Sequence, residues 1–213
     1  MVQNLPLFLD GLRTTLQLAV GALVLALAVG TLVALLRVSP LGVLRVAGTA
    51  YVEFLRNTPL LVQMFFWVFG LPFVGVVLPE FGGALLGLAF YTSAFVAEAV
   101  RAGILSIQHG QIEAARAMGL SYVQTMRLVV LPQAIAITVT PLGNLAIALT
   151  KNTSVASAVL VPELMYQAEV VNARTFATYE TFFVTAALYL ALTIPLSRLV
   201  ARLEHRLTRF RSA

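Results

Sequence analysis

The sequence has 213 residues, of which 60% are hydrophobic and only 11% are charged, against about 25% charged in ordinary soluble domains. A soluble fold of this length could not bury so much apolar surface, so we predict one integral membrane domain, residues 1–213, in the bilayer. The lack of cysteine excludes disulfides and thiolate metal sites, and we expect no metal or cofactor. The net charge of +5 indicates arginines at membrane borders rather than a nucleic-acid partner.

The chain begins MVQNLPLFLD, without a basic stretch, so we expect no cleaved signal peptide. A bilayer core of about 30 Å needs about 20 apolar residues per helix, which predicts five spans. These spans are residues 16–36, 59–78, 81–100, 132–150 and 181–199. Gly70 and Pro72 predict a kink in the second span, and residues 50–59 before it form a short amphipathic or interfacial piece. The predicted fold class is therefore an all-α membrane protein with about five transmembrane helices.

Basic residues indicate how these helices are oriented. Only Arg13, Lys151 and Arg174 fall on one side of the predicted spans. The other side holds Arg37, Arg45, Arg56, Arg101, Arg116, Arg127, Arg198, Arg202, Arg206, Arg209 and Arg211. The positive-inside rule then places the N-terminus outside and the C-terminus in the cytoplasm.

A long polar segment, residues 106–131, separates the third and fourth spans. Its pattern predicts a helix over residues 111–118, ended by Gly119 at a left-handed C′ position. Ser121 and Gln124 have the spacing of a capping box for a second helix. We expect a helix–turn–helix lying crosswise on the cytoplasmic face. Its length favours a docking surface, and an ordinary interfacial helix pair remains open as the alternative.

Polar residues also follow the fourth span, where Lys151 is the only lysine in the chain. The apolar run VASAVLV after them is too short to cross a bilayer, so it is a half-helix, an interfacial helix or a re-entrant piece. Thr153 and Ser154 have the chemistry to cap a half-helix, whose N-terminus and the Lys151 charge would seat a carboxylate. The alternative is that Lys151 reaches the outer headgroups and touches no substrate. We expect residues 151–176 to form this outer half-helix and gate segment.

Further candidates lie within the spans. Glu98 is near the cytoplasmic end of the third span, and Arg101 at i+3 is its expected partner. A structural pair is favoured there over an ammonium site, and Glu163 is a candidate for the outer gate or a receptor contact. The polar side chains expected to line a substrate cavity, besides Glu98, are Tyr91, Thr92, Ser93, Asn144 and the Lys151-Asn152-Thr153-Ser154 block.

Several of these motifs resemble a known family. Glu113-Ala114-Ala115, Gly119 and Leu131-Pro132 resemble the EAA coupling motif in the membrane subunits of ATP-binding-cassette importers. The blocks RNTPL, YTSAFVAE, PLGN and KNTS look like the polar amino acid permeases that take up histidine, glutamine, arginine and glutamate. The resemblance covers about residues 8–199, and it looks closest to the glutamate-uptake members.

This resemblance implies the type I importer permease fold in a bacterial cytoplasmic (inner) membrane. It implies four kinds of partner: a cytoplasmic ATPase dimer, a second permease subunit, an extracytoplasmic amino acid-binding protein and the lipid bilayer. It also implies that the loop transmits closure of the ATPase to the helices. The residues that would couple are Glu113, Ala114, Ala115, Arg116, Gly119, Leu131 and Pro132.

Two other classes of protein fit the sequence less well. The chain has no Walker A motif, so we expect it to be no enzyme and ATP hydrolysis to occur in a partner. An intramembrane protease is disfavoured because the only histidines, His109 and His205, both fall at the cytoplasmic face. A self-sufficient ion-coupled carrier is the alternative, disfavoured by five spans without an inverted repeat.

Overall fold

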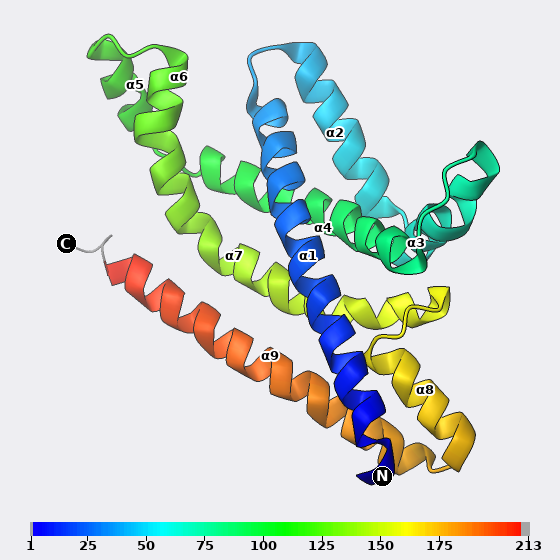
Figure 1. The fold of residues 1–213 in the computed structure, drawn as a ribbon. Coiled ribbons are helices and arrows are strands. Elements are labelled where there is room, and N and C mark those ends of the chain that lie inside the picture. Colours follow the sequence, from blue (N-terminus) through cyan, green and yellow to red (C-terminus); the bar gives the residue numbers. More distant parts are fainter. Residues whose placement is uncertain (1, 210–213) are drawn as a thin grey trace.

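The computed structural model describes residues 2–209, and every regular element in that range is a helix (Figure 1). The prediction of an all-α protein is therefore confirmed for the described chain. The elements are η1 (Val2–Asn4), α1 (Leu5–Val38), α2 (Gly42–Asn57), α3 (Leu60–Phe65), η2 (Phe66–Gly70), η3 (Leu71–Val74), α4 (Glu80–Leu105), α5 (His109–Ala117), α6 (Tyr122–Thr125), η4 (Met126–Val130), α7 (Leu131–Asn152), η5 (Thr153–Val159), α8 (Leu164–Thr175) and α9 (Thr178–Arg209).

Four helical segments of the described chain are long and apolar enough to cross a membrane. They are Leu5–Val38, Glu80–Leu105, Tyr122–Val159 and Thr178–His205. A fifth span results if α2 and the helical run Leu60–Val74, which are bent by 104° against each other, are counted together. The expectation of about five transmembrane helices is confirmed, but the second span is a broken one.

The bend in this second span lies at Thr58-Pro59. A residue before proline is disfavoured in the α conformation, and Thr58 adopts extended angles (φ −104°, ψ 130°) that end α2. Helix resumes at Leu60 and stops again at Gly75, whose φ of 83° is in the left-handed region. The amphipathic piece predicted over residues 50–59 is thus the end of the 16-residue helix α2, and the sharp bend lies at Thr58-Pro59 rather than at the predicted Gly70 and Pro72.

The chain accommodates two Leu-Pro pairs, Leu71-Pro72 and Leu131-Pro132, by a wide helical turn just before each of them. The N–H of Leu71 donates to the carbonyl of Phe66, and that of Leu131 donates to the carbonyl of Met126, five residues earlier in each case. A proline lacks an N–H and crowds the carbonyl four residues before it, and the π turn relieves both problems. Helix therefore continues through Pro132, where the sequence predicted the start of a separate span.

This continuity corrects the predicted layout of the polar segment. The helix after Ser121 is the cytoplasmic extension of the fourth span, since Tyr122–Val159 forms one helical run. Figure 1 shows α6 in line with α7, with α5 folded back beside it. The segment is a helical hairpin whose second helix continues into the fourth span, rather than a pair of helices separate from it.

The core of the molecule lies between α1 and α4. At Gly30 of α1, a Cβ atom would lie 2.6 Å from the carbonyl oxygen of Ser93 and 2.6 Å from the side chain of Val96. Only glycine allows so close an approach of the two helices, as is common in membrane interfaces. Within the most apolar window of α4, 61% of the residues are buried, compared with 17% for the windows in Tyr122–Val159 and α9. Much of the surface of these last two spans is left open for lipid or a partner.

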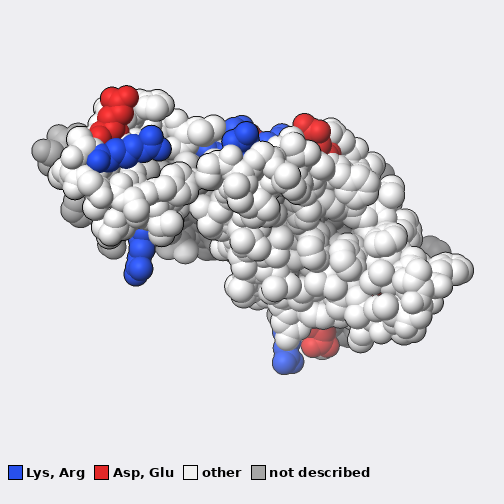
Figure 2. All heavy atoms as spheres, turned by 90° about the horizontal axis from the view of Figure 1, so that it is seen from above, with Lys and Arg blue, Asp and Glu red and all other residues white. Residues whose placement is uncertain are grey.

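Charged side chains occupy little of the surface. Figure 2 shows them near the margins of the face seen from above, around a broad area without charge. This distribution is expected for helices whose sides lie in hydrocarbon and whose ends reach water.

Candidate functional site

The α5–α6 hairpin turns at Gly119. Its φ is 82°, its N–H donates to the carbonyl of Arg116 (2.9 Å), and the N–H of Leu120 donates to that of Ala115 (3.2 Å). These two bonds form a Schellman motif, so the predicted C′ glycine is confirmed. A Cβ atom at Gly119 would meet nothing within 4 Å, so the tip of the hairpin is open to solvent or a partner.

The capping box predicted for the second helix is also present. The backbone N–H of Gln124 donates to the Ser121 hydroxyl (3.3 Å), and the side chain of Gln124 accepts from the N–H of Ser121 (2.8 Å). These reciprocal bonds satisfy two donors that a helix start leaves without partners.

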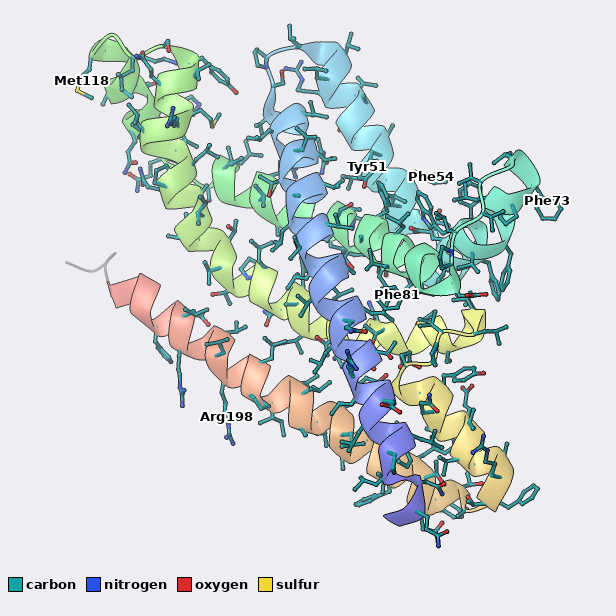
Figure 3. The ribbon with its side chains drawn as sticks, in the orientation of Figure 1. Tyr51, Phe54, Phe73, Phe81, Met118 and Arg198 are labelled. Atoms are coloured by element: carbon teal, nitrogen blue, oxygen red, sulfur yellow. The ribbon has the colours of Figure 1, made fainter. Side chains whose placement is uncertain are left out.

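The residues at the tip of the hairpin present their side chains outward. Glu113 and Ala114 are exposed, Met118 is 74% exposed, and Ala115 is buried against the body. Figure 3 shows Met118 pointing away from the molecule at the turn. One turn earlier in α5, Nδ1 of His109 lies 3.8 Å from a carboxylate oxygen of Glu113.

Two contacts hold this hairpin to the rest of the chain. The side-chain amide of Gln133 in α7 donates to the side chain of Gln111 in α5 (2.5 Å). The hydroxyl of Tyr122 donates to the carbonyl of Val38, at the end of α1 (3.4 Å). The hairpin is therefore attached to both α1 and α7.

A second candidate region is a small pocket between α4 and α7 with a volume of about 110 Å³. It is lined by Tyr91, Thr92, Phe95, Leu145, Ala148, Leu149 and Asn152. Three of the predicted cavity residues, Tyr91, Thr92 and Asn152, are thus brought together. Asn144 lies on the same face of α7, because residues four apart (144, 148 and 152) are in line along a helix.

Arg56 packs on Phe95, which lines this pocket, and sequence reasoning missed this contact. Its guanidinium carbon is 5.3 Å from the centre of the Phe95 ring, which in turn lies 5.0 Å from the ring of Tyr91. We predicted Arg56 at the cytoplasmic border, but α2 is about 24 Å long and carries it to the middle of α4. The cation–π contact with Phe95 offsets part of the cost of placing a charge there.

Ser93 faces away from this pocket. It is fully buried and bonded to the hydroxyl of Tyr51 (2.6 Å) and the carbonyl of Phe90 (2.7 Å). Figure 3 shows Tyr51 on α2 directed toward α4. Ser93 therefore joins α2 to α4 and does not line the pocket.

The segment from Lys151 to Ser154 is not the start of a half-helix. The backbone of Thr153 is helical and its N–H donates to the carbonyls of Leu149 and Lys151, so α7 runs directly into η5. The hydroxyls of Thr153 and Ser154 donate to carbonyls of Thr150 and Lys151 (both 2.8 Å) instead of capping N–H groups. The predicted half-helix N-terminus is absent from this part of the described chain, because no glycine or proline lies between Gly143 and Thr153 and the helix continues through this segment until Leu160.

The N-terminus that exists in this region belongs to α8, and Glu163 occupies it. Glu163 is 0% exposed, and its carboxylate accepts from the N–H groups of Met165 (2.9 Å) and Tyr166 (2.8 Å) and from the hydroxyl of Tyr189 (2.8 Å). The hydroxyl of Thr15 accepts from the N–H of Leu164 (3.1 Å). Burial raises the pKa of Glu163 above its ordinary value, and the two backbone bonds oppose that rise.

Glu98 has the predicted partner and a second one. Its two carboxylate oxygens lie 2.5 Å from Arg101 of the same helix and 2.5 Å from Arg37 of α1. The second pair links residues 61 positions apart, so local spacing could not reveal it.

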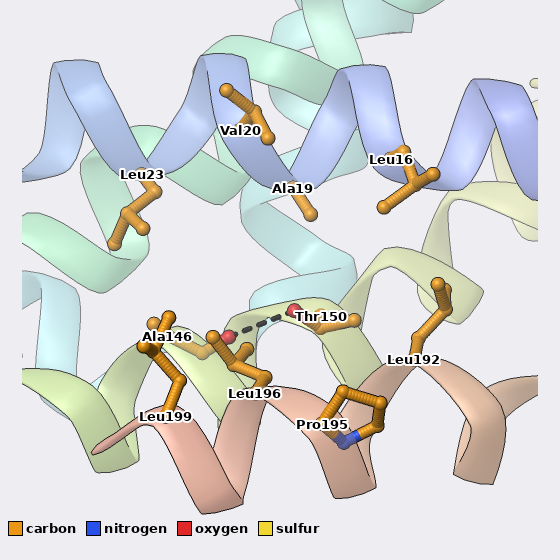
Figure 4. Close-up of a pocket in the computed structure, with 10 residues that line it drawn as sticks. All are labelled: Leu16, Ala19, Val20, Leu23, Ala146, Thr150, Leu192, Pro195, Leu196 and Leu199. Carbon is orange, nitrogen blue, oxygen red and sulfur yellow. Dashed lines mark hydrogen bonds between the residues drawn. The ribbon is translucent and has the colours of Figure 1, made fainter. Parts of the chain in front are cut away.

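An apolar pocket of about 360 Å³ lies between α1, α7 and α9 (Figure 4). The hydroxyl of Thr150, on its wall, donates to the carbonyl of Ala146 in its own helix (2.9 Å). The pocket therefore offers no free polar group to a zwitterionic amino acid, and lipid or another helix suits it better.

Comparison with known proteins identifies the chain. Residues 5–209 match the family described as "Binding-protein-dependent transport system inner membrane component". The chain belongs to this family. It is a multi-pass permease of the inner membrane, and permease subunits of this kind are not enzymes themselves.

Individual relatives agree over nearly the whole length. The chain is 44% identical to the "Probable glutamine ABC transporter permease protein GlnM" of Bacillus subtilis, over 97% of this chain and 96% of the relative. It is 38% identical to the "Glutamate transport system permease protein GluC" of Corynebacterium glutamicum, over 95% and 93%. These permeases confirm the predicted resemblance.

Solved structures show the same fold. A crystal structure of an amino acid ABC transporter with histidines is 35% identical, with a TM-score of 0.90 over 97% of this chain and 96% of that one. A chain of the MetNI methionine ABC transporter, 23% identical, has a TM-score of 0.80 over 95% and 97%. The architecture is therefore that of the type I ABC importer permeases, as predicted.

Proposed function

We propose that this chain is the membrane subunit through which an ATP-driven importer takes up a polar amino acid, with glutamate and glutamine as the first choices. The observation that supports this most strongly is the outward-directed α5–α6 hairpin, closed by the bonds at Gly119, on a chain of this family. A self-contained carrier would have no use for such a projection.

In this proposal the hairpin, residues 106–131, couples to a cytoplasmic ATPase dimer. The exposed Glu113, Ala114 and Arg116 contact the ATPase, and Gly119 fixes the turn. Leu131 and Pro132 lie in the helical run that joins the hairpin to the fourth span, so a push on the tip moves α7 directly. The N-terminus is then outside and the C-terminus in the cytoplasm.

The two spans with the least buried surface suit a second permease subunit, either a copy or a paralogue. Only 17% of the residues in the windows of Tyr122–Val159 and Thr178–His205 are buried within the chain. An extracytoplasmic binding protein delivers the amino acid to residues 151–176, which form the outer gate segment.

The pocket between α4 and α7 is the proposed substrate contact in this chain. Arg56 supplies a positive charge for the substrate carboxylate, and Thr92 and Asn152 supply uncharged hydrogen-bonding groups. At 110 Å³ the pocket holds only part of an amino acid, so the rest of the path is completed by conformational change or by a second subunit.

The test is to co-purify the chain with its companions in mild detergent and to assay ATP hydrolysis with the binding protein and a panel of amino acids. A stoichiometric ATPase stimulated by glutamate or glutamine is the expected result. A chain that purifies alone, with uptake that survives ATP depletion while an ion gradient persists, would instead support the ion-coupled carrier.

The role of Arg56 is tested in the same reconstituted system. Replacement by Gln (Arg56→Gln) removes a charge-assisted hydrogen bond and should raise the substrate concentration for half-maximal uptake by about tenfold. Arg13→Gln, which removes an exposed arginine from α1, is the matched control and should change nothing. Equal kinetics in the two variants would exclude Arg56 from the substrate path.

A further inference from the structure

A cleft of about 430 Å³ lies at the cytoplasmic ends of α1, α2 and α4, away from the proposed substrate pocket. Arg37 of α1, Arg45 of α2 and Arg101 of α4 line it, together with Glu53 and a short stretch of α2 (Val46, Thr49 and Ala50). The transport function proposed above uses none of these residues.

The charges around the cleft do not balance. Arg37 and Arg101 share the carboxylate of Glu98, and among the described residues Glu53 is the only acidic one that lines the cleft itself. Three guanidinium groups thus face two carboxylates, which leaves 3 − 2 = +1. A ligand with one negative charge would neutralise the cleft.

The arginines of the cluster are held in place by the fold. The Nε atoms of Arg37 and Arg101 are buried, and neither has a hydrogen-bond partner among the described residues. Arg45 turns one end of its guanidinium to the carbonyls of Ser39 (3.2 Å) and Pro40 (3.3 Å), which orients it at the rim. The guanidinium groups are therefore positioned by the fold, since backbone carbonyls hold Arg45 at the rim while Glu98 holds Arg37 and Arg101.

The wall of the cleft is closely packed. At Gly48 of α2, a Cβ atom would lie only 2.7 Å from Cγ of Arg37, so the glycine lets α2 lie directly on the stem of that arginine. This contact fixes the distance between α1 and α2 and keeps Arg37 extended toward Glu98. The cleft is a built feature rather than a chance gap between surface side chains.

The surroundings of the cleft favour a lipid over a free anion. Val43 (82% exposed) and Val46 (70% exposed) lie on α2 beside Arg45 and offer apolar surface in continuity with the arginines. The cluster also lies at the helix ends that the basic residues assign to the cytoplasmic leaflet, where basic pockets between helices bind anionic headgroups.

We propose that this cleft binds the phosphate of an anionic phospholipid, with its acyl chains lying along the exposed valines of α2. A phosphodiester with one negative charge, as in phosphatidylglycerol, matches the charge of +1. The bound lipid would join α1, α2 and α4 at the cytoplasmic surface.

The proposal is tested by native mass spectrometry of the full chain in detergent, titrated with dioleoylphosphatidylglycerol or with dioleoylphosphatidylcholine. We expect one phosphatidylglycerol to be retained in preference to phosphatidylcholine. Arg45→Gln should weaken this binding about fivefold, and Glu53→Gln should strengthen it by a similar factor. Arg198→Gln, which removes an exposed arginine of α9 outside the cleft, is the matched control.

The opposite signs of the two variants separate binding from a loss of folding, since damage to the fold would not strengthen lipid retention. Retention that is unchanged in both variants, or no preference over phosphatidylcholine, would overturn the proposal. Millimolar inorganic phosphate provides the remaining comparison. Persistence of the bound lipid supports a lipid site, whereas its displacement would assign the cleft to a free anion and reject the lipid.

Discussion

The two ends of this permease are built on opposite principles. The cytoplasmic hairpin satisfies its backbone groups locally, through the Schellman bonds at Gly119 and the reciprocal bonds of Ser121 and Gln124. The outer segment satisfies its groups through distant partners, since Glu163 is reached by Tyr189 of α9 and Leu164 by Thr15 of α1. One region is self-contained and exposed, and the other is buried and interlocked.

This difference indicates what each region is able to do. A hairpin that holds its own shape, with its tip free, can be pressed by a partner without unfolding. The outer segment cannot move alone, because Glu163 and its neighbours tie α1, α8 and α9 together. Movement at the outside must therefore displace several helices at once, as alternating access requires.

The largest effect on transport is expected from Gly119→Pro. Proline cannot adopt a φ of 82° and has no N–H to donate to Arg116, so the turn is distorted by roughly 3 kcal/mol. Uptake should be lost while membrane insertion is retained, because no described atom lies within 4 Å of a Cβ at this position and the strain stays within the turn. Gly110→Ala, in the same hairpin with open space around it, is the control. Normal uptake by Gly119→Pro would disprove the coupling role.

The largest effect on stability is expected at the other end, from Glu163→Ala. The change removes a helix cap and leaves the hydroxyl of Tyr189 without its buried acceptor, which should cost about 3 kcal/mol of unfolding free energy. Thermal unfolding in detergent measures it. Tyr189→Phe removes one of the three bonds and should cost about 1 kcal/mol. A Glu163→Ala protein as stable as the parent would show that the outer segment is not interlocked.

A smaller effect on stability is expected from a change in pH, and it should arise at the outer segment through Glu163. Because burial raises the pKa of Glu163 in the folded state above its ordinary 4.5, the folded chain holds this proton more tightly than the unfolded chain does. Stability from this group is therefore greatest at low pH and falls as pH rises from 4.5 through the raised value. The unfolding temperature of the parent, relative to Glu163→Gln, should rise on acidification from neutral pH. An unfolding temperature that falls on acidification would mean that the capping bonds lower the pKa of Glu163 by more than burial raises it.

The same contrast explains what could be predicted from the sequence. Apolar runs revealed the spans, and the glycine and capping box of the hairpin were recognisable because all their partners lie within five residues. We missed three sets of contacts, because they depend on how α1, α2 and α9 pack. These are the ion pair of Arg37, the ring contact of Arg56 and the hydrogen bonds of Glu163. No local pattern records a bond between residues 61 positions apart.

Helix breaks were the least predictable feature. Pro132 does not end a helix because Leu131 finds a carbonyl five residues back, and Thr58 does end one because Pro59 follows it. Both outcomes follow from a proline, and only the neighbouring backbone decides between them. The predicted half-helix at Thr153 failed for the related reason that polar residues alone do not interrupt a helix.

The smallest effect is expected from Lys151→Ala, which tests how much of the outer region faces the substrate. Lys151 is exposed at the end of α7, one residue before Asn152 of the α4–α7 pocket. An exposed charge contributes about 0.2–1 kcal/mol, so the rate of glutamate uptake at low concentration should fall by at most about fivefold. ATP hydrolysis should remain coupled to transport, because the residue is far from the hairpin. Lys151→Arg, which keeps the charge, should restore uptake. Kinetics identical to the parent in both variants would mean that Lys151 only anchors the helix to the outer headgroups, and Arg56 would then be the sole cation of the proposed path within the described chain.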